Sequence, residues 1–276
     1  MLAFSFYRTR SKSGKRSKSG DMKVIVLIPA RYASSRFPGK PLAKIGGVEM
    51  IVRVCRQVSL TGYELAVATD DRRILECVEH ASFRGVLTGE NHPSGTDRIA
   101  EAYRKLGIEA DVIVNVQGDE PFIYPEQIRS VVDIFARNPE TQLATLVRRF
   151  PKEGGYDTLA DPNLVKVTVS SRGEALYFSR SVIPYVRNAE TATWPAAVDY
   201  HTHVGLYAYR PQVLREIVAL PRSPLEIAES LEQLRWLENG YRIAVAETDK
   251  PTIGIDTPAD LAAAEQDNFE FVNVEF

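Results

Sequence analysis

Cationic side chains follow the first apolar run of the sequence. Residues 24–28 are all apolar, which is typical of a buried parallel strand, and Arg31, Arg36 and Lys40 come soon after them. Open α/β folds bind ligands where parallel strands end, because loop amides and side chains are exposed there. The type and spacing of these residues therefore predict a polyphosphate site in the loop at 29–42.

This loop matches neither of two common nucleotide-binding motifs. It lacks the G-x-G-x-x-G of dinucleotide-binding folds and the G-x-x-x-x-G-K-[ST] of P-loop proteins. The phosphates would be held by long side chains as well as by amides, which suits a triphosphate that is cleaved.

Two aspartates far apart in the sequence are candidates for binding a cation. Asp119 follows the apolar run at 111–116, and Asp256 precedes a predicted helix that begins near Pro258. Taken singly, Asp119 could form a turn and Asp256 could cap the helix. Taken together beside a cationic loop, they predict a Mg²⁺ site, because Mg²⁺ favours one or two carboxylates plus substrate phosphates.

The segment at 92–98 is rich in small and polar residues and opens a predicted helix. Its simpler interpretation is a Ser or Thr N-cap. Its functional interpretation is a base-recognition loop, in which Ser94 meets the base edge and Arg98 braces the loop. Residues 68–71 end the second predicted strand and could line the same pocket.

Three residues suggest a second, acceptor-binding region. Arg180 lies in an apolar context that favours an inward-facing cation suited to a carboxylate, although a surface arginine is the alternative. His203 and Tyr207 have even spacing on a predicted strand and should share one face. A packed core histidine is the alternative for His203.

A continuous helix is predicted over 224–238. Its expected buried stripe consists of Ile227, Leu231 and Leu234. An adjacent face carries Glu226, Glu229 and Gln233. Ser223 and Glu226 also have the spacing of a capping box, so Glu226 could cap the helix or bind a sugar.

The alternation of apolar runs and amphipathic stretches predicts the elements that position these residues. Strands are expected at 24–28, 64–68, 111–116, 142–147 and 242–246. Helices are expected near 48–59, 71–80, 96–106, 125–137, 211–219, 224–238 and 257–265. This order is typical of an α/β fold with a parallel sheet covered on both faces.

The domain organisation follows from where this alternation holds. Residues 22–276 are expected to form one domain, and about 150–210 to form an insertion that carries acceptor and dimer surfaces. Within it, 164–170 alternates in polarity and suggests strands with one solvated face. Residues 1–21 are a basic, Ser- and Gly-rich tract that cannot bury a core, so we expect a disordered extension.

The charge balance gives no reason to expect nucleic acid or membrane as a partner. The chain has 34 basic and 36 acidic residues and a net charge of −2. No segment approaches a membrane span, so a cytoplasmic protein is expected. A nucleic-acid-binding role has only the basic residues 8–18 in its favour.

Eight sequence blocks together resemble the 3-deoxy-manno-octulosonate cytidylyltransferases, also called CMP-Kdo synthetases. The first block reads Ile-Pro-Ala-Arg-Tyr-Ala-Ser-Ser-Arg-Phe-Pro-Gly-Lys-Pro-Leu at 28–42. The others lie at 68–70, 92–96, 115–121, 175–180, 203–207, 223–235 and 254–258. The resemblance runs in order from Met22 to about Gln266 and leaves residues 1–21 outside.

The resemblance implies a Rossmann-like fold with a mostly parallel sheet, of the nucleotide-diphospho-sugar transferase type, a homodimer, and Mg²⁺ as cofactor. The implied reaction transfers CMP from CTP to the anomeric hydroxyl of 3-deoxy-D-manno-octulosonate (Kdo). It releases pyrophosphate and forms CMP-Kdo for lipopolysaccharide synthesis.

The resemblance also implies roles for individual residues. Catalysis would use Arg31, Lys40, Asp119 and Asp256, with the two aspartates as Mg²⁺ ligands. CTP would contact Ala30, Arg31, Ser34, Arg36, Lys40, Thr69, Ser94, Gly95 and Arg98. Kdo would contact Gln117, Arg180, His203, Tyr207, Glu226 and Gln233.

Alternatives to this function stay open at the level of sequence. An 8-amino analogue of Kdo is a close alternative acceptor, and a sialic acid is a more distant one because the 177–180 and 223–226 blocks favour Kdo. Ile227 stands where relatives often have a polar residue, and 186–200 does not align with them. A nucleotide-binding regulator without catalysis is an alternative of a different class. The presence of Lys40, Asp119 and Asp256 argues against it.

Overall fold

The computed structural model describes residues 22–33 and 36–266. The predictions for residues 1–21 and for Ser34 therefore lie outside the described residues. The strands are β1 (Val24–Ala30), β2 (Lys44–Ile45), β3 (Val48–Glu49), β4 (Glu64–Thr69), β5 (Gly85–Leu87), β6 (Val112–Asn115), β7 (Leu143–Arg149), β8 (Lys166–Val169), β9 (Ala175–Ser179), β10 (His201–Tyr209) and β11 (Ile243–Thr248). The α-helices are α1 (Met50–Ser59), α2 (Arg72–His80), α3 (Gly95–Leu106), α4 (Pro125–Arg137), α5 (Tyr156–Ala160), α6 (Trp194–Ala197), α7 (Pro211–Val218), α8 (Pro224–Glu229), α9 (Glu232–Glu238) and α10 (Pro258–Gln266). The described residues also include the short 3₁₀ helices η2 (Lys40–Leu42) and η3 (Thr191–Thr193).

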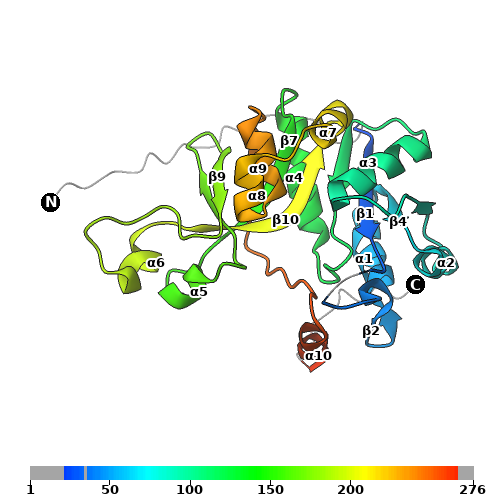
Figure 1. Cartoon of the computed structure of the whole chain (residues 1–276), viewed down its shortest axis with the longest axis horizontal. Coiled ribbons are helices and arrows are strands. Elements are labelled where there is room, and N and C mark those ends of the chain that lie inside the picture. Colours follow the sequence, from blue (N-terminus) through cyan, green and yellow to red (C-terminus); the bar gives the residue numbers. More distant parts are fainter. Residues whose placement is uncertain (1–21, 34–35, 267–276) are drawn as a thin grey trace, which may run out of the picture.

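The central sheet has the strand order β11-β7-β10-β6-β1-β4-β5. β1 pairs in parallel with β4 and β6, β4 pairs in parallel with β5, and β7 pairs in parallel with β11. β10 runs antiparallel between β6 and β7. The predicted α/β fold with a mostly parallel sheet is therefore confirmed, and within this strand order β10 runs opposite to its neighbours (Figure 1).

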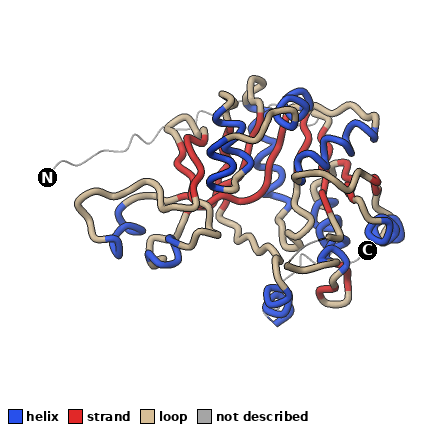
Figure 2. The backbone as a smooth tube through the Cα atoms, in the orientation of Figure 1, coloured by secondary structure: helices blue, strands red, loops and turns tan. Residues whose placement is uncertain are grey.

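Helices cover both faces of the sheet, as the buried strands predicted (Figure 2). On β1, Val26 and Ile28 pack against one layer, which contains apolar side chains of α1, α2 and α4. Ile25 and Leu27 point the other way and pack against α3, α7 and α9. Burial on both faces explains why this strand is apolar at every position and why its ligand-binding end is rigidly placed.

A smaller lobe extends from one side of the sheet (Figure 1). The antiparallel pair β8–β9 joins it to β10. It also contains α5, η3 and α6, with a small core of its own that includes Phe150, Leu159, Trp194 and Tyr200. The predicted insertion at about 150–210 overlaps β10, which belongs to the central sheet, so the part that leaves the sheet ends before residue 201.

The prediction of one continuous helix over 224–238 is wrong, because this stretch forms two helices, α8 and α9. Ser230 adopts a left-handed conformation with φ of 52°, and Leu231 is extended. The break turns Leu231 and Leu234 into the core while Ile227 stays 57% exposed. The predicted stripe of Ile227, Leu231 and Leu234 therefore does not exist as one face.

None of the helices within 22–33 and 36–266 combines the length and hydropathy that a membrane crossing requires.

Candidate active site

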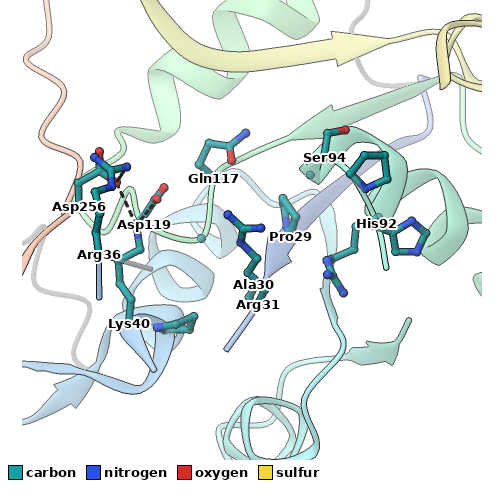
Figure 3. A pocket seen from close by; sticks show the side chains of 15 residues that line it. Pro29, Ala30, Arg31, Arg36, Lys40, His92, Ser94, Gln117, Asp119 and Asp256 are labelled. Atoms are coloured by element: carbon teal, nitrogen blue, oxygen red, sulfur yellow. Dashed lines mark hydrogen bonds and ion pairs between the residues drawn. The ribbon is translucent and has the colours of Figure 1, made fainter. Parts of the chain in front are cut away.

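A pocket opens at the carboxyl ends of β1 and β6, where the sequence predicts ligand binding (Figure 3). The predicted residues that line it are Ala30, Arg31, Arg36, Lys40, Ser94, Gly95, Arg98, Gln117, Asp119 and Asp256. They come from segments up to 226 residues apart (30 to 256). Topology rather than sequence proximity therefore assembles the pocket.

Two glycines allow the loops around the pocket to approach each other closely. Gly39 has φ of +73°, and its N–H donates to the carbonyl of Tyr32 over 2.9 Å, which closes the phosphate loop ahead of Lys40. A Cβ on Gly118 would lie 2.7 Å from the carbonyl oxygen of Pro29. A side chain at Gly118 would therefore push the loop after β6 away from the end of β1.

Lys40 links the two aspartates at one end of the pocket (Figure 3). Its Nζ lies 2.6 Å from Asp119 Oδ2 and 3.2 Å from Asp256 Oδ1, and its side chain is 13% exposed. Arg36 makes a second ion pair with Asp256 at 3.1 Å. The structure thus brings together two carboxylates and two of the predicted phosphate-binding cations.

The helix-capping interpretation of Asp256 does not hold. Asp260 accepts the backbone N–H groups of Asp256 and Thr257 at the start of α10, at 3.0 and 2.8 Å. The backbone N–H of Ile255 donates to the carbonyl of Asp119 over 2.9 Å and holds the two segments together. The Asp256 carboxylate is therefore free of a capping role and faces Lys40 and Arg36.

The donor set around Lys40 is compatible with Mg²⁺. Within the described residues, no group of three or more His, Cys, Asp or Glu side chains is arranged to hold a metal. Asp119 and Asp256 supply two hard oxygen donors, and the nearby cations would place substrate phosphates beside them. Two carboxylates completed by phosphates and water are the environment that Mg²⁺ favours.

Glu120 is a third carboxyl at this end that the sequence reasoning missed. Burial, together with the neighbouring charges of Asp119 and Asp256, raises its pKa to about 8. Its Oε2 has no hydrogen-bond partner. The consecutive acidic residues at 119–120 are the signal that could have drawn attention to it, since two adjacent carboxylates cannot both ionise easily in a buried site.

Ser94 and Arg98 also line the pocket, and Ser94 lies at the end away from Lys40 (Figure 3). Ser94 caps α3, as its simpler interpretation predicted, and its hydroxyl accepts the N–H of Asp97 over 3.2 Å. Arg98 is 4% exposed and braces the preceding loop through Thr88 Oγ1 at 2.7 Å and Asp70 Oδ2 at 2.7 Å. Thr69 does not line the pocket; it is fully buried, and its hydroxyl accepts the N–H of Asp71.

The residues implied in acceptor binding are more dispersed. Gln117 lines the pocket and lies against β10, since a Cβ on Gly205 would be 3.9 Å from Gln117 Cγ. His203 and Tyr207 share a face of β10 as predicted, with ring centroids 5.2 Å apart. Neither lines the pocket described above, so Gln117 is the residue that joins the two regions.

The remaining three residues implied in acceptor binding do not line the pocket. Two of them form hydrogen bonds within the chain, and the third is buried. Arg180 donates to the carbonyls of Glu229 and Pro162, at 2.7 and 2.9 Å. Glu226 forms the capping box with Ser223 at the start of α8. Gln233 is 5% exposed, and its Nε2 has no hydrogen-bond partner.

Glu232 is a second residue that the sequence reasoning missed. Its carboxylate accepts Ser94 Oγ at 2.9 Å and Thr96 Oγ1 at 2.7 Å, so it ties α9 to the start of α3. Burial raises the pKa of Glu232, and the hydrogen bonds from Thr96 and Ser94 oppose that rise. Its place directly before Gln233 in the 231–235 block is the signal that could have identified it.

His203 is held in its neutral form. Burial lowers its pKa from 6.5 to about 4. Thr145 Oγ1 lies 3.0 Å from His203 Nε2 and donates its proton to the Leu206 carbonyl over 2.8 Å. Because the threonine has a single hydroxyl proton, Nε2 must be the donor to it, and the imidazole carries its proton on Nε2.

This lowered pKa predicts acid sensitivity. The unfolded chain binds a proton at His203 below pH 6.5, whereas the folded chain does so only below about 4. The free energy of unfolding should therefore fall as the pH drops from 6.5 to 4, by about 3 kcal/mol at most for this group. Urea unfolding of the wild type and of His203→Gln at several pH values checks this, with a flatter profile expected for the variant. Parallel profiles would show that other groups cause the acid sensitivity.

The chain is similar to known proteins over most of its length. The model of the cytidylyltransferase family matches residues 25–243. A 3-deoxy-manno-octulosonate cytidylyltransferase of Parabacteroides distasonis is 54% identical over 244 residues, covering 88% of this chain and 97% of that protein. The enzyme of the same name from Bacteroides thetaiotaomicron is 53% identical, with coverages of 89% and 98%.

Solved structures are similar as well. The structure of a CMP:2-keto-3-deoxy-manno-octonic acid synthetase complexed with CTP superposes with a TM-score of 0.81 at 42% identity, covering 88% of this chain and 97% of that one. A cytidylyltransferase from Leptospira borgpetersenii shares the fold alone, with a TM-score of 0.55 at 17% identity. The chain therefore belongs to the cytidylyltransferase family, as the sequence motifs predicted.

Proposed function

We propose that the chain transfers CMP from CTP to the anomeric hydroxyl of Kdo, with release of pyrophosphate. The observation that carries this proposal is that the two ends of the pocket differ in their chemical groups. Lys40, Arg36 and two carboxylates lie at one end, and the capped start of α3 lies at the other. A nucleoside triphosphate matches this arrangement, because its phosphates lie at one end and its base at the other.

The chain's own cations stabilise charge in this reaction. Attack of a sugar hydroxyl on the α-phosphorus builds negative charge on the phosphate oxygens and on the departing pyrophosphate. Arg31, Arg36 and Lys40 line the pocket where that charge develops. Positioning and electrostatic stabilisation supply most of the catalysis in phosphoryl-type transfers, so these residues need not relay protons.

Asp119 and Asp256 are the residues that would hold Mg²⁺, which would act as a Lewis acid on phosphate oxygens and on the attacking hydroxyl. Lys40 bridges the same two carboxylates. When CTP enters, its phosphates would compete for Lys40 and free the aspartates. The Lys40 ammonium would then bind the phosphates, and the two carboxylates would be available to hold Mg²⁺.

The acceptor is proposed to bind between Gln117 and β10. The Tyr207 hydroxyl and Gln233 Nε2 are buried without hydrogen-bond partners, and Trp236 Nε1 is in the same state. The Tyr207 and Trp236 rings are 5.1 Å apart, so two of these groups belong to one cluster. Buried polar groups without partners are costly, and a polyhydroxylated sugar acid would satisfy them.

Pyrophosphate release tests this function. Purified protein, CTP and Mg²⁺ are combined in parallel with Kdo, 8-amino-Kdo or N-acetylneuraminate, and release is expected with Kdo. Release only with the amino sugar would keep the chemistry and change the acceptor. CTP binding without release for any acceptor would identify a nucleotide-binding protein that lacks catalysis.

We further propose a cytoplasmic homodimer that serves lipopolysaccharide synthesis. Large apolar side chains are exposed at Leu176 on β9, Leu225 and Ile227 on α8, and Tyr185. β9 and α8 are neighbours, since Ser179 Oγ donates to Glu229 over 2.6 Å. A second copy of the chain would cover this apolar surface, and the molar mass in solution tests whether it does.

A further inference from the structure

Glu101 on α3 contacts the loop that precedes its own helix. It lies three residues after Arg98, so the two side chains share a face of the helix. Its carboxylate is 14% exposed. None of the sequence motifs includes Glu101, and it does not line the pocket.

The Glu101 carboxylate holds two residues of this loop at once. Its Oε2 accepts the backbone N–H of Gly89 over 3.0 Å and also contacts Nε2 of His92. Arg98 binds the carbonyl of the same Gly89 at 3.2 Å. The two polar backbone groups of Gly89 are therefore fixed from α3, one by a carboxylate and one by a guanidinium.

The charge on Glu101 determines which ring nitrogen of His92 donates a hydrogen bond. Hydrogen bonds from Lys105, Gly89 and His92 lower the pKa of Glu101 to about 2, so the carboxylate is ionised at neutral pH. An ionised carboxylate only accepts hydrogen bonds. His92 Nε2 must therefore carry a proton and donate it to Glu101, which fixes the orientation of the ring.

The loop fixed in this way is a wall of the pocket. His92 and the next two residues, Pro93 and Ser94, line it, and His92 and Ser94 lie at the end away from Lys40 and Asp256 (Figure 3). This is the end where the proposed function places the base of CTP. A wall held in its binding conformation before the ligand arrives saves the entropy of ordering it during binding.

We propose that Glu101 is a positioning residue for recognition of the nucleotide base, acting through His92 and Gly89. The inference rests on the proposed function for the identity of the nucleotide. The geometry also separates two roles on one helix: Arg98 anchors the loop to β4 through Asp70, and Glu101 sets the ring that faces the pocket.

The test compares Glu101→Gln with the wild type. Calorimetric titration with CTP should show binding about tenfold weaker in the variant, because a charge-assisted hydrogen bond is lost. In steady state, KM for CTP should rise while kcat and KM for the acceptor stay within about twofold, and the preference for CTP over UTP should fall. A fall in kcat together with similar rises in KM for CTP and in KM for the acceptor would indicate a general loss of structure. That result would overturn the proposal.

Two further variants sharpen this test. Glu79→Gln is the matched control, because it makes the same chemical change on the exposed face of α2 and does not line the pocket; CTP binding should be unchanged. Glu101→Asp keeps the charge but is too short to reach His92 in the same way, so it should also weaken CTP binding. It serves in place of the glutamine variant if that variant does not fold.

The outcomes separate this proposal from the proposed function. Wild-type protein that fails to bind CTP would overturn the proposed function, whatever Glu101 does. Wild-type protein that binds CTP, together with a Glu101→Gln variant that binds equally well and discriminates equally against UTP, would overturn only the role of Glu101.

Discussion

Replacing Asp256 by asparagine is expected to lower kcat by about two to three orders of magnitude while CTP binding is largely kept. The substituted amide would retain the shape of the side chain but lose the charge that faces Lys40 and Arg36. A neutral amide is a poor ligand for Mg²⁺, so charge on the phosphates would be less well stabilised. Pyrophosphate release at saturating CTP and acceptor measures kcat, and calorimetry measures CTP binding.

A matched control is available on α4. Asp133→Asn makes the same chemical change on an exposed surface away from the pocket and should have near-normal turnover. Near-normal turnover of Asp256→Asn at saturating Mg²⁺ would contradict the assignment of Asp256 as a metal ligand.

Replacing Lys40 by methionine is expected to have two opposite effects. Turnover should fall by about a hundredfold to a thousandfold, because the cation that stabilises the phosphates is lost. Mg²⁺ binding to the nucleotide-free protein should become tighter, because the ammonium that lies 2.6 and 3.2 Å from the two carboxylates no longer competes for them. Titration with MgCl₂ in the absence of CTP measures the second effect.

Lys44→Met is the control for this pair of effects. Lys44 is 61% exposed and pairs with Glu49 on β3, so its removal should change neither turnover nor Mg²⁺ binding. Weaker Mg²⁺ binding in Lys40→Met would show that Lys40 supports the metal site instead of competing with the metal.

The sequence predicts those parts of the site whose residues lie close together in the chain or border a recognisable strand or helix. The apolar run of β1 and the cations after it are adjacent in the chain, so strand, loop and polyphosphate site follow from local reasoning. Asp119 and Asp256 lie 137 residues apart (256 − 119), yet each could be placed because each borders a recognisable strand end or helix start. The rule that ligands bind where parallel strands end places Asp119 beside the cationic loop. Asp256 is held there by the long-range hydrogen bond from the Ile255 N–H to the Asp119 carbonyl.

The parts that the sequence does not predict depend on long-range packing. The break at Ser230 occurs inside a stretch with good helical spacing, in which residues 225–238 include neither proline nor glycine. It is held by tertiary contacts, including the Arg180 side chain on the Glu229 carbonyl. Glu101 and Glu232 escaped notice because a glutamate on an amphipathic helix is usually a solvated surface residue, and only the folded chain shows what each one holds.

The position of β10 also sets the order in which the chain can fold. β7 has only β10 and β11 as neighbours in the described sheet, and both follow it in sequence. During synthesis, β1, β4, β5 and β6 can associate early, whereas β7 waits until residues 201–209 emerge and bridge it to β6. Completion of the sheet is therefore a late, non-local event, and until then the exposed edges of β6 and β7 are the surfaces at which a nascent chain of this family is most open to misassociation.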